Sequence, residues 1–224
     1  MKKLCYLLFA LALTSCGTNK FLTSSVPAEQ VKDMNYIEPI TYIHYVEKGN
    51  KSVLSDSLSQ ITARVIDSVL QADSSRFKLS DKMIIANDSV NARIENELNY
   101  LSQMTLRYKK LDEIALPPTL DSIMQSNDER FAMIIVASGF GRKKGNYGGQ
   151  VAKGIAVGIL TLGMAVPSPV KSNLTLYGFI LDKEKHNVAF YQRLLPNKEK
   201  EPTDPQFINT QLHKLFEGYL YPAQ

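Results

Sequence analysis

The glycine-rich part of the chain contains the spacing that phosphate-binding loops use. Gly149 and Gly154 have the separation of the two outer glycines of a P-loop. A P-loop needs Lys and then Ser or Thr directly after its last glycine, because these side chains hold the phosphates and the magnesium ion. Ile155 and Ala156 stand at those two places. The P-loop motif is therefore incomplete.

The turn that begins at Gly139 has a second nucleotide-like pattern and a cluster of cations. Gly139 and Gly141 follow an apolar run, as in a dinucleotide-binding turn, but Lys144 occupies the place of the third glycine. Arg142, Lys143 and Lys144 are candidates for an anion contact, and a solvated basic turn is the alternative. With both nucleotide motifs incomplete, no cofactor is expected.

Metal-binding and catalytic patterns are also lacking in the sequence. His44, His186 and His213 each stand without a second ligand at metal-binding spacing. Ser138 has Val136 two residues before it, where a nucleophile elbow requires glycine. We therefore assign no catalytic residue and no metal ligand, and we expect that the protein is not an enzyme.

The amino terminus has the organisation of an export signal. Lys2 and Lys3 precede the apolar run Leu4–Leu13, which is about half of the roughly twenty residues that a membrane-spanning helix needs. The run therefore predicts a signal that is removed rather than a permanent span.

The four residues after this run predict a lipid anchor. Leu13, Thr14, Ser15 and Cys16 resemble the bacterial lipobox, in which a lipid is added to the cysteine thiol and the signal is cut before the cysteine. The resemblance implies that Cys16 is the first residue of the mature chain and that its acyl chains hold the protein on a membrane. A secreted protein cut near Ser15 is the alternative.

Cysteine and charge counts limit the remaining classes of protein. Cys5 leaves with the signal and Cys16 is acylated, so the mature body forms no disulfide and is held by its core alone. Of 26 basic and 22 acidic residues, Lys2 and Lys3 also leave with the signal. The remaining excess of positive charge is too small to favour a nucleic-acid partner.

Residues 148–166 form an apolar segment interrupted by one charge, Lys153. The uninterrupted part, 154–166, covers about 20 Å as a helix, less than the roughly 30 Å of hydrocarbon in a bilayer. Burial in the protein or an oligomer contact, membrane contact, and a ligand loop are the three interpretations. The residues assigned to membrane or oligomer contact are Gly154, Ile155, Val157, Gly158, Ile159 and Leu162.

The periodicity of apolar residues predicts an α/β (α+β) fold. We expect a mixed sheet in the order β-α-β-α-β-(insertion)-β-β-α with helices packed on it. The predicted strands are 40–48, material within 76–86, 130–140, 173–182 and 187–195, and the predicted helices are 55–72, 90–110, 119–125 and one that starts near 204. The domain organisation predicted is a signal peptide over 1–15, a lipidated tether over 16–33, and a single domain over 34–224 with a glycine-rich apolar insertion at about 141–171.

Three phrases of the body resemble a known superfamily: "SDSLSQITARVIDSVLQADSSRFKLSD", "LPPTLDSIMQSNDERFAMIIVASG" and "ILDKEKHNVAFYQR". They are similar to the α/β lipoproteins that include the curli-secretion pore lipoprotein and the amino-terminal domain of the Tol–Pal translocation protein. The resemblance extends roughly over residues 37–195. It implies a role in envelope assembly, secretion or transport, and in the curli-secretion family insertions into the body form membrane-crossing hairpins of an oligomeric pore.

These observations together predict a non-enzymatic envelope lipoprotein that acts through protein contacts, as an accessory of a secretion or transport assembly. Its partners are expected to be a membrane, through the acyl chains, and other envelope proteins, with homo-oligomers as a further expectation. In the lipoproteins that the chain resembles, acidic clusters after the cysteine help to direct traffic, so the absence of such a cluster after Cys16 implies the outer membrane and a periplasm-facing address. An oligomeric pore-forming subunit and a periplasmic hydrolase or ligand-binding protein are the alternatives.

Overall fold

The structure is a computed structural model and describes residues 21–48, 51–85, 87–108, 110–143, 171–195 and 199–222. Within them, eight strands form one mixed sheet. The strands are β1 (Leu22–Thr23), β2 (Met34–Ile37), β3 (Ile40–Lys48), β4 (Lys51–Leu54), β5 (Leu79–Met83), β6 (Phe131–Arg142), β7 (Asn173–Asp182) and β8 (Asn187–Leu194). The helices are α2 (Asp56–Ala72), α3 (Asp88–Arg107), α4 (Pro118–Gln125) and α6 (Pro205–Phe216), with a 3-10 turn η1 (Leu111–Glu113). The predicted α/β (α+β) class, with helices on a mixed sheet, is confirmed.

Short polar side chains define where three of the helices begin. The side chain of Ser55 accepts a hydrogen bond from the Leu58 amide at the start of α2. Asn87 and Asp204 do the same for amides in the first turns of α3 and α6. These caps satisfy amide groups that have no partner within a helix, so each helix starts within two residues of its predicted position.

Strand β6 lies at the centre of the sheet. It pairs antiparallel with β7 along one side, from Phe131 with Asp182 to Phe140 with Asn173. Along its other side it pairs parallel with β2 and then with β3. Pro39 lies between β2 and β3 and has no amide hydrogen to donate, which explains why two strands follow one another along this edge of β6.

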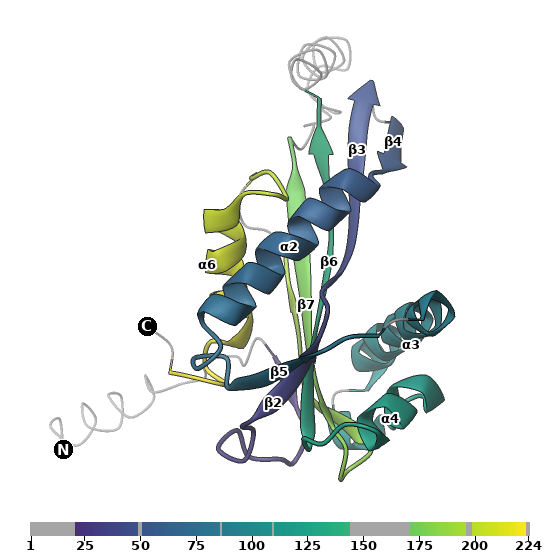
Figure 1. The fold of residues 1–224 in the computed structure, drawn as a ribbon, viewed down its shortest axis with the longest axis vertical. Helices are drawn as coiled ribbons and strands as arrows, with labels where there is room; N and C mark the ends of the chain where they lie inside the picture. Colours follow the sequence, from purple (N-terminus) through teal and green to yellow (C-terminus); the bar gives the residue numbers. More distant parts are fainter. Residues whose placement is uncertain are drawn as a thin grey trace, which may run out of the picture.

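The two faces of the sheet pack against different pairs of helices. Met133, Ile135 and Ala137 of β6 point to one face and pack in a core with residues of α2 and α6. Ala132 and Ile134 point to the other face and pack with residues of α3 and α4. Because successive side chains of a strand alternate between faces, one apolar strand supplies both cores. Figure 1 shows α2 and α6 on one side of the sheet and α3 with α4 on the other.

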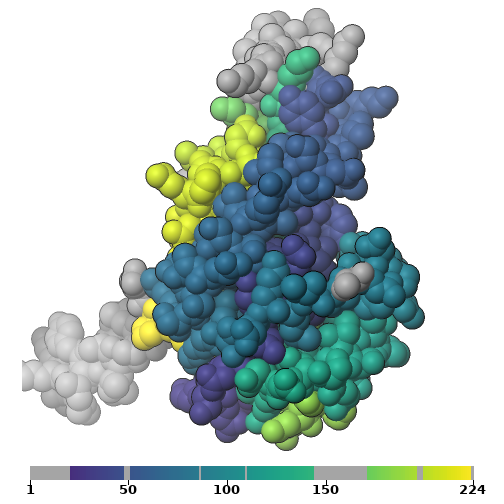
Figure 2. Space-filling model, in the orientation of Figure 1, coloured from purple at the N-terminus to yellow at the C-terminus, as the bar shows by residue number. Residues whose placement is uncertain are grey.

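The helices on the second face cover only part of it. In Figure 1, α3 and α4 lie beside the lower half of the sheet, while β3, β4 and β6 continue upward past them. In Figure 2, α2 crosses the front of the molecule and reaches the end where β3 and β4 lie. One face is therefore covered along most of its length, whereas the upper part of the other face carries no helix among the described residues.

Residues 21–33, assigned from the sequence to the tether, lie against the sheet. β1 pairs antiparallel with β8, and Val26 and Val31 are buried. The reason is that this segment, although rich in turn-forming residues, carries apolar side chains that the sheet edge and the first core accept. Within the described part of the chain, no helix is both long and apolar enough to span a bilayer.

Gly178 of β7 allows α6 to approach the sheet closely. A Cβ atom at this position would lie 2.9 Å from Leu215 Cδ2 and 3.1 Å from Phe216 Cζ. We expect Gly178→Ala to lower the free energy of unfolding by about 1–3 kcal/mol, because α6 must move away from the strand. Urea denaturation of the two proteins measures this difference.

A matched control for this substitution is Gly141→Ala on β6. There the nearest atom to a new Cβ is the flexible carboxylate of Glu201, at 3.1 Å, and the next atoms are 3.8 Å away. This variant should stay within about 0.5 kcal/mol of the unmodified protein, as neutral substitutions do. Equal losses in the two variants would contradict the assigned packing of α6.

Candidate functional site

Two adjoining cavities occupy the upper part of the second sheet face. The first has a volume of about 360 Å³ and lies between α3 and strands β3, β6 and β7. The second has a volume of about 470 Å³ and continues along the same strands. Ser138 and Tyr177 line both cavities, so the two form one continuous depression. We call it the open groove.

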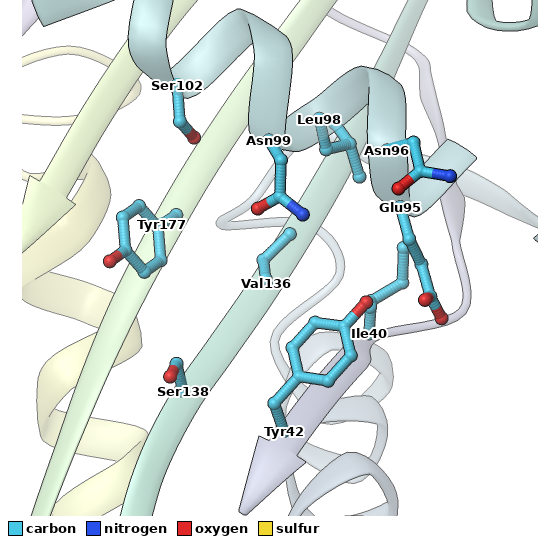
Figure 3. A pocket seen from close by; sticks show the side chains of 10 residues that line it. All are labelled: Ile40, Tyr42, Glu95, Asn96, Leu98, Asn99, Ser102, Val136, Ser138 and Tyr177. Atoms are coloured by element: carbon cyan, nitrogen blue, oxygen red, sulfur yellow. The ribbon is translucent and has the colours of Figure 1, made fainter. Parts of the chain in front are cut away.

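The sheet register explains how the groove is built. Tyr42 of β3, Ser138 of β6 and Thr175 of β7 are paired across the three strands. One row further along, His44 and Asn173 flank Phe140. Ser138, with its short side chain, therefore forms a low point of the floor between larger aromatic neighbours. Figure 3 shows Tyr42, Ser138 and Tyr177 on three strands of the sheet, together with the α3 residues that line the same cavity.

Aromatic rings and guanidinium groups pair along the groove. The guanidinium carbon of Arg142 lies 5.7 Å from the centre of the Phe140 ring. That of Arg193 lies 5.5 Å from the centre of the Tyr177 ring. Both distances fall within the range of cation–π attraction, which orients each guanidinium along the sheet face. The groove thus carries two permanent positive charges above an aromatic floor.

A tyrosine and a carboxylate close the end of the groove that lies beside α3. Tyr42 of β3 and Glu95 of α3 both line this end of the first cavity. Burial of Tyr42, followed by its interaction with the nearby carboxylate of Glu95, raises the pKa of the Tyr42 hydroxyl.

The structure places two residues of the predicted anion-contact cluster differently. Arg142 is the last residue of β6, is half-buried and lines the open groove. Lys143 follows it and is exposed, and the lining of the groove does not include it. Lys144 lies outside the described residues. Of this cluster, the structure brings Arg142 alone into the groove, where it is joined by Arg193, which the sequence analysis did not single out.

The remaining groove residues were missed, although β6 carries a signal for them. Its first half is apolar at successive positions, as expected of a strand covered on both faces. From Ser138 onward the alternate residues are Ser138, Phe140 and Arg142, a pattern typical of a strand with one face open. Tyr42 and His44 repeat that alternation on β3. Reading the change of pattern along β6 would have located the groove.

Several predicted site residues lie outside the described part of the chain. These are Cys16 and the lipobox residues Leu13, Thr14 and Ser15, together with the contact residues Gly154, Ile155, Val157, Gly158, Ile159 and Leu162. Within the described ranges, no group of three or more His, Cys, Asp or Glu side chains is placed to hold a metal ion. His186 contacts Asp121 at 2.8 Å, and His213 contacts Asp73 at 2.9 Å.

The fold and the groove define the class of structure as a mixed α/β sheet, with one face covered by helices and the other partly open. No protein-family model matches the chain, and no curated protein matches it. Among solved structures, a PelC dodecamer from Paraburkholderia phytofirmans is similar with a TM-score of 0.38 and 6% identity, over 91% of this chain and 95% of that chain. A second PelC dodecamer from the same organism has a TM-score of 0.36 and 8% identity, over 91% and 98%. Likenesses at these scores support no argument about function.

Proposed function

We propose that this chain is a lipid-anchored protein of the bacterial envelope that acts through protein contacts and catalyses no reaction. The signal sequence and Cys16 support the anchor, and the open groove is the proposed contact site. The resemblance stated from the sequence supports the setting, an accessory role in secretion or transport at a periplasm-facing outer-membrane address.

The observation that carries the contact role is the composition of the groove. Tyrosine and arginine are enriched among the residues that dominate the energy of protein interfaces, and phenylalanine is also enriched at such interfaces. Tyr177, Phe140 and Tyr42 are half-buried there, with ring surface facing the cavities. A partner that covered these rings would remove apolar surface from water.

Charge favours an acidic partner segment. Arg193 carries a fixed positive charge beside the second cavity, and guanidinium groups bind carboxylates through paired hydrogen bonds. The carboxylate of Glu95 lies at the other end of the groove, in the lining of the first cavity. We therefore expect the partner to place acidic side chains over the second cavity, near Arg193.

Photocrosslinking in living cells tests this contact. A photoreactive phenylalanine analogue at Tyr177 should give an adduct with an envelope protein, whereas the same analogue at the exposed Gln71 of α2, on the other side of the sheet, should not. In the Tyr177-labelled chain, Arg193→Glu should reduce the adduct about tenfold, the effect of losing about 1.4 kcal/mol of binding.

Arg64→Glu is the matched control for the charge reversal. Arg64 is an exposed arginine of α2, which covers the other face of the sheet. This variant should leave the adduct unchanged. Equal adducts from positions 177 and 71, or an adduct that does not respond to Arg193→Glu, would show that the groove is not the contact site.

A further inference from the structure

The first described residues of the chain are fastened along the edge of the sheet. Leu22 pairs with Tyr191 and Thr23 with Phe190, both on β8. The amide of Ser24 continues this ladder by donating to the carbonyl of Ala189 at 3.0 Å. Backbone pairing of this kind fixes both the position and the direction of the segment. We call residues 21–33 the strap.

Side chains of the strap pack on the body along its length. The ring of Phe21 lies 5.5 Å from that of Phe190 and 5.8 Å from that of Tyr219, measured between ring centres. Val26 is 5% exposed and Val31 is fully buried. Burial removes these apolar side chains from water, so the strap is held by apolar packing as well as by hydrogen bonds.

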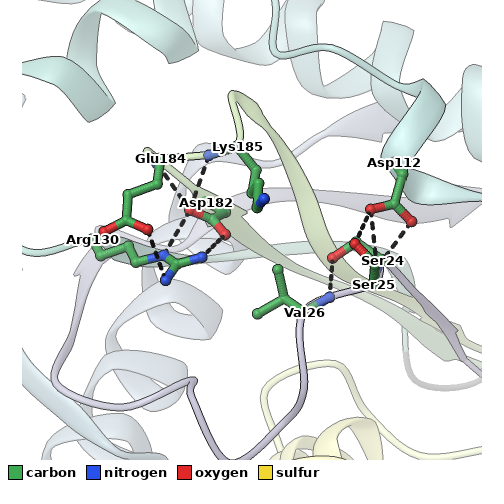
Figure 4. A network of polar contacts seen from close by, with 8 residues as sticks. All are labelled: Ser24, Ser25, Val26, Asp112, Arg130, Asp182, Glu184 and Lys185. Carbon is green, nitrogen blue, oxygen red and sulfur yellow. Dashed lines mark hydrogen bonds and ion pairs between the residues drawn. The ribbon is translucent and has the colours of Figure 1, made fainter.

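A carboxylate accepts hydrogen bonds from the middle of the strap. Asp112 of η1 accepts hydrogen bonds from the amide of Ser25 at 2.9 and 3.0 Å and from its hydroxyl at 2.6 Å (Figure 4). These bonds, from the side chain first and then from the backbone, lower the pKa of Asp112. At Ala28, the carbonyl oxygen accepts a further hydrogen bond from Lys78 Nζ at 3.1 Å. Residues of η1 and β8 and the residue directly before β5 thus all contact this one short segment.

The docked strap limits how far the body can lie from Cys16. Five residue steps separate Cys16 from Phe21, and a fully extended chain covers at most about 17 Å in five steps. If residues 21–33 were undocked, the reach from Cys16 to Met34 would be roughly 60 Å. The contacts of the strap therefore reduce the largest possible distance between Cys16 and the start of the folded body from roughly 60 Å to about 17 Å.

We propose that the strap holds the body against the bilayer in one orientation, with the corner formed by Phe21 and residues 217–222 facing the lipid headgroups. The proposal rests on the acylation of Cys16 proposed above. The contact of Phe21 with Tyr219 places the last described residues beside the first ones, so both belong to this corner. The partner of the corner is the membrane surface, and the strap sets its distance.

The register of the sheet places the tip of β4 far from this corner. Leu22 is in line with Tyr191, Phe179 and Ile134 across the sheet. From Ile134 the sheet continues to Arg142, which pairs with Val46, and then to Lys51 at the start of β4. At about 3.3 Å per residue, this path extends roughly 30 Å along the strands. In the proposed orientation, Lys51 therefore lies farther from the bilayer than the corner formed by Phe21 and residues 217–222.

Energy transfer to a membrane dye tests the orientation. The mature chain has no cysteine other than Cys16, so Lys214→Cys on α6 or Lys51→Cys on β4, both exposed, gives a single labelling site. The acylated full chain is placed in vesicles of phosphatidylethanolamine and phosphatidylglycerol that carry a headgroup acceptor dye. Transfer should be strong from position 214 and weak from position 51. Similar transfer from both positions would overturn the proposal.

Lengthening the tether tests the role of the strap without altering its contacts. A flexible insertion of about twelve Gly and Ser residues between Asn19 and Lys20 should lower the transfer from position 214 toward that of position 51, because it lets the body lie farther from Cys16. An unchanged signal would overturn the proposal. A chain that is not acylated would not bind the vesicles, and this result would remove the proposed anchor as well as the present proposal.

Hydrogen exchange tests the docking on its own, in a Cys16→Ser chain that is produced without residues 1–15. Asp112→Ala should speed the exchange of the Ser25 amide about tenfold, since it removes a charge-assisted hydrogen bond. Glu113→Ala, at the next and equally exposed position of η1, is the matched control and should leave the exchange unchanged. Rapid exchange of Ser24 and Ser25 in the unmodified chain would show that the strap is undocked, and would contradict this proposal while leaving the anchor intact.

Discussion

Replacing Cys16 by serine is expected to abolish incorporation of a fatty-acid probe and to change both the processing and the fractionation of the protein. The lipid is attached to a cysteine thiol, and a serine hydroxyl does not replace it at position 16. Each buried methylene of an acyl chain contributes about 0.8 kcal/mol to membrane binding, so several chains make the difference nearly all-or-none. Metabolic labelling followed by fractionation measures both effects.

The signal sequence supplies a matched control for this experiment. Cys5 lies within the apolar run and leaves with the signal, so Cys5→Ser should be labelled and fractionated like the unmodified protein. Labelling that persists in the Cys16→Ser variant, or that is lost in Cys5→Ser, would contradict the assigned anchor. A chain that is processed near Ser15 but never labelled would support the secreted alternative.

Arg130→Ala is expected to lower the free energy of unfolding by about 3 kcal/mol or more. Asp182 is fully buried at the end of β7, and Arg130 donates two hydrogen bonds to its carboxylate, at 2.7 and 3.0 Å. These bonds raise the pKa of Arg130, whose guanidinium also lies over the Phe131 ring. Removing the arginine leaves a buried charge without its counterion, which is among the costliest of single substitutions. Urea denaturation of a Cys16→Ser chain that is produced without residues 1–15 measures the loss.

A second ion pair of the same arginine provides the comparison. Arg130 Nη1 lies 2.8 Å from the carboxylate of Glu184, whose side chain is 62% exposed. Glu184→Gln should cost less than about 0.5 kcal/mol, because solvent screens an exposed pair. If the two variants unfolded at the same urea concentration, Asp182 would not depend on Arg130 as the structure indicates.

The long elements of the fold could be predicted because their pattern lies within one stretch of sequence. Strand β3 spans the predicted residues 40–48, and α2 starts at Asp56, one residue after its predicted start at Ser55. The predicted hairpin of β7 and β8 is also confirmed, with its turn at residues 183–186. In each case the apolar spacing repeats often enough to distinguish a helix from a strand.

The short strands could not be predicted in this way. β1, β2 and β4 have two to four residues, too few for a period to be recognised. The four residues of β4 are all exposed, so they show no alternation of buried and exposed side chains. Each of these strands exists because a longer neighbour supplies its hydrogen-bond partners.

The local pattern of residues was therefore enough to specify the class of fold, while the export signal and the anchoring cysteine stay predictions. It was not enough to specify the open groove, which depends on where α3 lies relative to β3 and β6, or the strap, which depends on Asp112 and Phe190 meeting residues 21–25. Both features consist of contacts between residues far apart in the chain. Such contacts depend on how helices and strands pack against one another. The spacing of residues within one helix or strand therefore does not predict them.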